Sequence, residues 1–192
     1  MIKLNDWKEY LRKNKMLSFT FVRHPFERLV SAYKNKVLQE RGTKLFKEVT
    51  RESGESTRKF TDDGHKILQW YKDNHSFPAF IDLVLNGYKG EKVSNGHWNP
   101  ITPRCRYCDV EYDVIGRMET FDEDLRYIVM KKNLHEVLPL EELSLSMNSA
   151  KSMSTKTAKD YFSQISKEQI VKLYKYYNLD FELFGYDVTP YL

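Results

Sequence analysis

Cysteine is scarce in this chain of 192 residues, which contains only Cys105 and Cys108. The two residues form a Cys-x-x-Cys pair, and two thiols cannot complete a four-ligand zinc site without histidine or carboxylate partners. A thioredoxin-like redox pair needs a strand–helix–strand context, which the flanking sequence does not show. We therefore expect a local disulfide or two structural thiols at this position, and no metal site.

Long hydrophobic runs are also missing. No segment approaches the roughly 18 consecutive apolar residues that a membrane-spanning helix needs. No secretory signal precedes the first predicted helix. The triplet Asn74-His75-Ser76 is a formal glycosylation sequon, which is a weak indication of a secretory location.

A dense basic stripe is absent as well. The 31 Lys and Arg residues stand against 27 Asp and Glu residues, which leaves a formal net charge of +4. This mild excess suits an anionic ligand such as a nucleotide or an acidic glycan. The excess is smaller than the dense basic stripe of a nucleic-acid-binding protein would give, so we expect no nucleic-acid partner. The length and a hydrophobic content of 41% fit a single globular domain over residues 1–192.

The first clear structural unit lies near the start of the chain. Residues 17–22 (LSFTFV) alternate apolar and polar side chains, which predicts a strand. Arg23 and His24 form a short turn, and Pro25 follows at the first position of a helix, where proline is favoured. Apolar residues then recur every three or four positions up to about residue 39, as on one face of a helix. The pattern predicts a strand, a tight turn and an amphipathic helix.

A second strand is predicted at residues 112–116 (YDVIG), followed by a helix from Thr120 to about Lys132. A capping box predicts a helix that starts at Ser166. The fold class is therefore α/β with a parallel sheet. Further helices are predicted at residues 5–15, 63–74 and 77–86, loops at 87–109 and 133–157, and a flexible polar insertion at 41–63.

The strand–turn–helix unit has the groups that a phosphate site needs. A helix N-terminus offers backbone amides and a partial positive charge. Arg23 at the strand end adds a fork of charged donors, Ser31 adds a hydroxyl, and Arg28 shares a helix face with Ser31. The glycine-rich Walker motif is absent. The alternative is that both arginines pair with nearby carboxylates and that Ser31 is an ordinary helix residue.

These residues carry a resemblance to a known family. FTFVRHPFERLVSAYKNK is very close to the 3'-phosphate-binding segment of the Golgi carbohydrate sulfotransferases, which include the chondroitin and dermatan 4-sulfotransferases and the enzymes that make the HNK-1 epitope. Four further segments resemble that family in the same order: HWNPITPRCRYC at residues 97–108, YDVIGRMETFDED at 112–124, AKSMSTKT at 150–157, and YFSQIS with LYKYYNLDFELFGY up to residue 186.

The resemblance implies a P-loop-NTPase-like sulfotransferase fold with a parallel sheet flanked by helices. It implies that Arg23 and Ser31 hold the 3'-phosphate of 3'-phosphoadenosine 5'-phosphosulfate, the co-substrate, without any metal. Lys151 and Ser152 are expected to add donor contacts at the opposite rim of the site. Family members carry an earlier loop for the 5'-phosphosulfate, which this sequence does not show, so we expect an N-terminally truncated domain. A membrane anchor is expected only in a full-length form.

Catalysis by such an enzyme needs a general base near the acceptor hydroxyl. His97 is the first candidate because the resemblance covers its His-Trp pair, and the face of Trp98 suits stacking on a sugar ring. The alternative is that His97 only orders its loop. Glu119 and Asp124 are less suited, since carboxylates at a helix start usually act as caps. The resemblance also implies that Cys105 and Cys108 staple the loop that carries His97.

The function implied is transfer of a sulfuryl group to a sugar hydroxyl of a glycosaminoglycan or glycoprotein glycan. The location implied is the Golgi lumen, as a type II membrane protein when full length. The alternative is a catalytically incomplete fragment or degenerate relative that acts as a nucleotide- or glycan-binding module. The missing upstream loop favours that alternative, whereas the absence of Walker residues disfavours a P-loop kinase.

Overall fold

The computed structural model describes residues 13, 16–39, 74–87, 90, 92–93, 95–131, 133 and 156–192. The chain divides into two compact units. The first comprises Met1–Arg23 with Cys105–Thr155, and the second comprises His24–Arg104 with Lys156–Leu192. The elements predicted at residues 5–15, 41–63 and 63–74 lie almost entirely outside the described residues.

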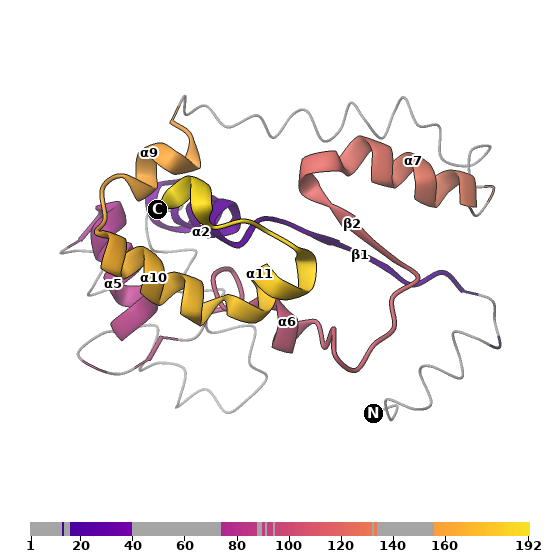
Figure 1. Ribbon diagram of the computed structural model, residues 1–192, viewed down its shortest axis with the longest axis horizontal. Helices are drawn as coiled ribbons and strands as arrows, with labels where there is room; N and C mark the ends of the chain where they lie inside the picture. The colour runs from indigo at the N-terminus through magenta and orange to yellow at the C-terminus, as the bar shows by residue number, and fades with distance from the viewer. Residues whose placement is uncertain are drawn as a thin grey trace. The chain divides into compact units, whose positions relative to one another are not determined.

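The first unit contains a two-stranded parallel sheet (Figure 1). Strand β1 (Phe19–Val22) pairs with β2 (Val114–Arg117), and the register places Phe21 opposite Gly116. A Cβ atom at Gly116 would lie 2.6 Å from the Phe21 ring, so any larger residue here would have to displace that ring. The same ring packs on Phe121 with 4.7 Å between the ring centroids. Both predicted strands and their parallel pairing are confirmed, and so is the α/β class.

Strand β2 leads into helix α7 (Phe121–Lys131) through a 3-10 turn, η2 (Met118–Thr120). The Asp124 carboxylate accepts hydrogen bonds from the Arg117 amide at 2.7 Å and from the Thr120 hydroxyl at 2.8 Å. These are the bonds of a carboxylate that caps the start of a helix. Asp124 thus ties the first turn of α7 to the end of β2, which agrees with a structural role for this carboxylate.

The second unit begins with helix α2 (Pro25–Ala32), which starts at Pro25 as predicted. It continues as a π-helix, η1 (Tyr33–Gln39), so the predicted end near residue 39 is correct although the change of winding was not foreseen. Helix α5 (Phe77–Asn86) also matches its prediction, and the Ser76 hydroxyl caps it by accepting from the Ala79 amide.

Helices of the C-terminal segment complete the second unit. The predicted capping box is present, because the Ser166 hydroxyl and the Gln169 side chain bond to each other's backbone amides at the start of α10 (Lys167–Tyr176). The helix predicted from Ser166 through residue 178 is α10, which ends at Tyr176, whereas the sequence does not predict the helix that follows it, α11 (Asn178–Phe184). The elements are α6 (Ile101–Arg104), α9 (Ala158–Phe162), α10 (Lys167–Tyr176), α11 (Asn178–Phe184) and the 3-10 turn η3 (Thr189–Tyr191).

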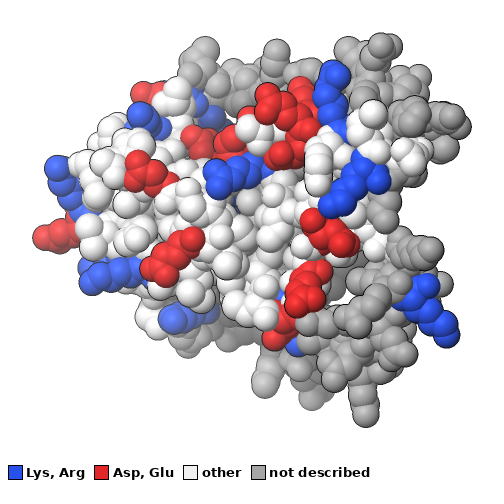
Figure 2. All heavy atoms as spheres, turned by 45° about the vertical axis from the view of Figure 1, so that its right-hand side comes forward, with Lys and Arg blue, Asp and Glu red and all other residues white. Residues whose placement is uncertain are grey.

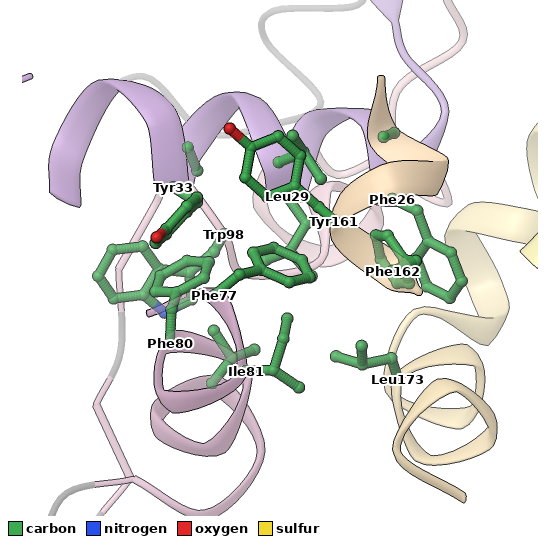
Figure 3. Packing of buried hydrophobic residues seen from close by; sticks show 14 of the residues in the cluster. Phe26, Leu29, Tyr33, Phe77, Phe80, Ile81, Trp98, Tyr161, Phe162 and Leu173 are labelled. Carbon is green, nitrogen blue, oxygen red and sulfur yellow. The ribbon is translucent and has the colours of Figure 1, made fainter. Parts of the chain in front are cut away.

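Aromatic side chains dominate the core of the second unit (Figure 3). Phe26 stacks on Phe162 with 4.4 Å between ring centroids, and the Phe80 ring meets Trp98 edge-on at 5.5 Å. These rings come from α2, α5, α9 and the segment before α6, so the aromatic side chains join elements that are distant in sequence. Most of the stability of this unit should come from this burial.

Charged side chains of both signs are interspersed on the face drawn in Figure 2. Such mixing agrees with the small net charge of the chain. Among the described helices, none is long and apolar enough to cross a membrane.

Candidate functional site

The start of α2, predicted to face a phosphate, is organised by His24. The His24 Nδ1 atom accepts a hydrogen bond from the Phe26 amide at 3.1 Å, so the ring caps the helix. Since Nδ1 is an acceptor, the ring proton is on Nε2, which donates to the Asp187 carbonyl oxygen at 3.1 Å. His24 therefore links the helix start to the C-terminal segment.

Replacing His24 with alanine should lower the free energy of unfolding by about 1 to 2 kcal/mol, because the Phe26 amide loses its cap. Urea denaturation followed by circular dichroism would measure the loss. His24→Asn is the matched control, since asparagine is a strong N-cap residue and should retain most of the stability. An alanine variant as stable as the parent would show that the cap contributes nothing.

Arg28, predicted to contact the phosphate, reaches from α2 to the segment that carries His97. Its Nη1 donates to the His97 carbonyl oxygen at 3.0 Å, and its Nη2 donates to the Asn99 carbonyl oxygen at 2.6 Å. Nη2 also lies 3.9 Å from a carboxylate oxygen of Asp180, and the Arg28 side chain is only 17% exposed. The guanidinium is thus engaged by the protein itself, and a phosphate contact by Arg28 stays a prediction.

Asp180 on α11 holds the other end of the same segment. Its carboxylate accepts from the Ile101 amide at 2.9 Å and from the Thr102 amide and hydroxyl at 2.9 and 2.6 Å. The residue is 1% exposed. A buried carboxylate needs such donors and a nearby cation to offset its lost hydration. Asp180 therefore caps the start of α6 and balances Arg28.

Two tyrosines at the end of α10 hold the middle of the segment. The Tyr177 hydroxyl donates to the Trp98 carbonyl oxygen, and the Tyr176 hydroxyl donates to the Asn99 Oδ1 atom at 3.4 Å. Burial raises the pKa of Tyr177 above its ordinary value, so its phenol stays protonated and available as a donor. The Arg28 guanidinium lies 5.8 Å from the centre of the Tyr177 ring, which adds a cation–π contact.

The segment held in this way spans residues 97–102 and begins with His97. The His97 side chain is half-buried, and its amide donates to the Asn95 Oδ1 atom at 2.8 Å. The next residue, Trp98, is 1% exposed and lies in the aromatic core. The expectation that Trp98 stacks on a sugar is therefore wrong, because no face of its ring is available.

The other residues predicted to bind the donor or to act as a base lie in different parts of the chain. Ser31 is half-buried on α2, in the second unit, and Arg23 is the last residue of the first unit. Their joint contact with one phosphate stays a prediction. Lys151 and Ser152 lie outside the described residues. Glu119 is exposed in the turn before α7.

Cys105 and Cys108 are free thiols in the structure, the first half-buried and the second exposed. This agrees with the alternative of two unpaired thiols rather than with the expected disulfide staple. Burial raises the pKa of the neighbouring Tyr107 to about 12, and its hydroxyl lies 3.0 Å from that of Thr20. Within the described part of the chain, no group of three or more His, Cys, Asp or Glu residues could hold a metal ion.

No sequence motif assigns a role to Tyr176, Tyr177 or Asp180. The spacing of Asp180 from neighbouring apolar residues, however, indicates that it is buried. It lies on a helical stripe with Tyr177, Phe181 and Phe184, all of which are buried. An acidic residue on an apolar stripe is almost never fully buried without a partner. The stripe therefore indicates a buried partner, although it cannot name the partner.

The chain matches the sequence profile described as the sulfotransferase family over residues 2–187. It is 31% identical over 187 residues to carbohydrate sulfotransferase 11 of Mus musculus, an alignment that covers 94% of this chain and 50% of the relative.

Two other relatives have related names. The chain is 30% identical over 198 residues to carbohydrate sulfotransferase 12 of Mus musculus, covering 92% of this chain and 41% of the relative. It is 27% identical over 194 residues to carbohydrate sulfotransferase 10 of Xenopus laevis, covering 94% and 50%. The chain spans about half the length of the curated relatives it matches, or less. No solved structure matches it significantly.

Proposed function

The chain belongs to the sulfotransferase family, and from this we propose that it transfers a sulfuryl group from 3'-phosphoadenosine 5'-phosphosulfate to a sugar hydroxyl. The main support is the family match over residues 2–187 together with relatives that are named carbohydrate sulfotransferases. The proposal includes a P-loop-NTPase-like fold, for which the parallel pair β1–β2 and the helix that directly follows β1 in the chain are the available support.

In this proposal Arg23 and Ser31 hold the 3'-phosphate of the donor. The support lies in the sequence RHPFERLVS and in the start of α2 at Pro25, which gives Ser31 its place on a helix directly after the strand. A guanidinium fork and a hydroxyl both donate hydrogen bonds to phosphate oxygens. Lys151 and Ser152 are proposed to add contacts to the donor, on the resemblance of their segment alone.

The reaction requires one bond to form and one to break. The oxygen of the sugar hydroxyl attacks sulfur, the bond between sulfur and the bridging oxygen of the 5'-phosphate breaks, and that oxygen takes the electron pair. The hydroxyl proton must leave as the new bond forms, and we assign its removal to the imidazole of His97. Alignment of the two substrates supplies much of the rate enhancement, as in phosphoryl transfer.

The acceptor is proposed to be a glycan, either a glycosaminoglycan or a glycoprotein sugar, because of the relatives' names. The proposed location is the Golgi lumen, with a membrane anchor in the full-length form. The sequon at Asn74 is compatible with a lumenal chain, since His75 and Ser76 are exposed and Asn74 is only half-buried. The alternative of a binding module without transfer is not favoured, because the relatives carry names of transferases.

A transfer assay tests this function. The 192-residue chain is incubated with radiolabelled donor and a panel of desulfated chondroitin, dermatan and glycoprotein glycans, with the boiled protein as control. We expect label on at least one glycan. A folded chain that binds 3'-phosphoadenosine 5'-phosphate but labels none of them would support the binding-module alternative.

A further inference from the structure

We propose that Arg28 and Asp180 are positioning residues that hold residues 97–102 in place and thereby fix the His97 imidazole for proton removal. This inference depends on the proposed function for its catalytic part. It assigns Arg28 a role different from the phosphate contact that the sequence predicts. The residues concerned all belong to the second unit.

Residues 97–102 are held by many hydrogen bonds for so short a segment. Five of its six residues form a backbone hydrogen bond with a side chain that is remote in sequence, from 69 to 79 positions away. Arg28 and Tyr177 bind its carbonyl oxygens, and Asp180 binds its amides. Backbone anchors fix the path of the chain whatever its side chains are, so the direction of the His97 Cα–Cβ bond is fixed with them.

The guanidinium of Arg28 uses its donors on the protein backbone. Its two Nη atoms each donate to a carbonyl oxygen, and among the described residues its buried Nε has no hydrogen-bond partner. A guanidinium presents its donors in a rigid planar fork. The two donors that bond to the His97 and Asn99 carbonyl oxygens therefore cannot bind a ligand without breaking those hydrogen bonds. A phosphate ligand would need those donors free.

Arg28 is also coupled to Asp180. The pair lies 3.9 Å apart, and the Asp180 carboxylate is 1% exposed. One carboxylate thus compensates the buried cation and binds the amides of Ile101 and Thr102. Because Arg28 is on α2 and Asp180 is on α11, the helix proposed to bind the donor is joined directly to the segment that carries the proposed base.

The test compares Arg28→Met, Arg28→Lys and Asp180→Asn in the 192-residue chain. The matched controls are Arg126→Met and Glu182→Gln, which change exposed residues. Three quantities are measured: kcat and KM of transfer, the Kd of 3'-phosphoadenosine 5'-phosphate by calorimetry, and amide hydrogen exchange of residues 95–102 relative to α5. Circular dichroism verifies that each variant is folded.

We expect Arg28→Met and Asp180→Asn to lower kcat at least tenfold while the Kd changes less than threefold. Exchange at residues 95–102 should rise at least tenfold with exchange in α5 unchanged. Arg28→Lys should recover part of kcat, because an ammonium group can still donate to one of the two carbonyl oxygens. The control variants should match the parent.

Two results would overturn the proposal. A Kd that rises tenfold or more in Arg28→Met with unchanged exchange at residues 95–102 would make Arg28 a phosphate ligand. Unchanged exchange in both Arg28→Met and Asp180→Asn would remove the anchoring role. If the parent chain transfers no sulfate, the proposed function fails separately, and the exchange data alone then decide whether these residues anchor the segment.

Discussion

Replacing His97 with alanine is expected to lower kcat for sulfate transfer by about 10²- to 10⁴-fold, the usual contribution of a positioned general base. The affinity for 3'-phosphoadenosine 5'-phosphate should stay within threefold of the parent, since the imidazole is assigned to the acceptor hydroxyl and not to the donor phosphate. Single-turnover transfer on the preferred glycan, with calorimetry on the same samples, measures both quantities.

The matched control is His75→Ala. His75 is an exposed histidine of the same unit, and the hydrogen bond that it accepts from the Tyr33 hydroxyl goes to its backbone carbonyl, which the substitution keeps. This control should behave like the parent. A His97→Ala variant with kcat within threefold of the parent would show that the base is a different group, and Glu119 would be the next residue to replace.

Replacing Trp98 with alanine is expected to lower the free energy of unfolding by about 3 to 5 kcal/mol, as for other large-to-small substitutions in a packed core. The ring is 1% exposed and packs edge-on against Phe80, so its loss leaves a cavity (Figure 3). The bond from Tyr177 goes to the backbone oxygen of Trp98 and survives the substitution. Urea denaturation measures the loss.

Two further variants make this test specific. Trp98→Phe should be less destabilising than Trp98→Ala, because a smaller cavity forms and the indole Nε1 has no hydrogen-bond partner to lose among the described residues. Tyr127→Ala removes a ring that is 55% exposed and should change stability by less than about 0.5 kcal/mol. A Trp98→Ala variant as stable as the parent, with weaker glycan binding, would restore the sugar-stacking role.

Local signals in the sequence predicted the elements that position the site. Pro25 and the spacing of apolar residues after it predicted the start and extent of the helix that carries Arg28 and Ser31. Ser166 and Gln169 predicted the start of α10. These signals succeed because capping and helix periodicity depend on residues within one or two turns of each other.

The roles of Arg28, Trp98 and Asp180 could not be predicted in this way. Arg28 meets the His97 carbonyl 69 positions away, and Asp180 meets the Thr102 amide 78 positions away. Which side chains meet over such separations is decided by how the helices pack, and the spacing of residues in the sequence does not record it. The motifs that contain Arg28 and Trp98 therefore predict ligand contacts. In the structure Arg28 bonds to backbone carbonyl oxygens and Trp98 is buried in the core.

Binding of the sulfate donor through the segment Arg23–Ser31, the claim on which the proposed function rests, is tested by calorimetric titration with 3'-phosphoadenosine 5'-phosphate. The parent chain is compared with Arg23→Ala and with Arg126→Ala, an exposed arginine of the same unit. Loss of one charge-assisted contact should weaken binding by about 1.5 to 3 kcal/mol, or roughly 10- to 150-fold, in Arg23→Ala alone. Equal affinity in all three proteins, or no binding by a folded parent chain, would contradict the claim.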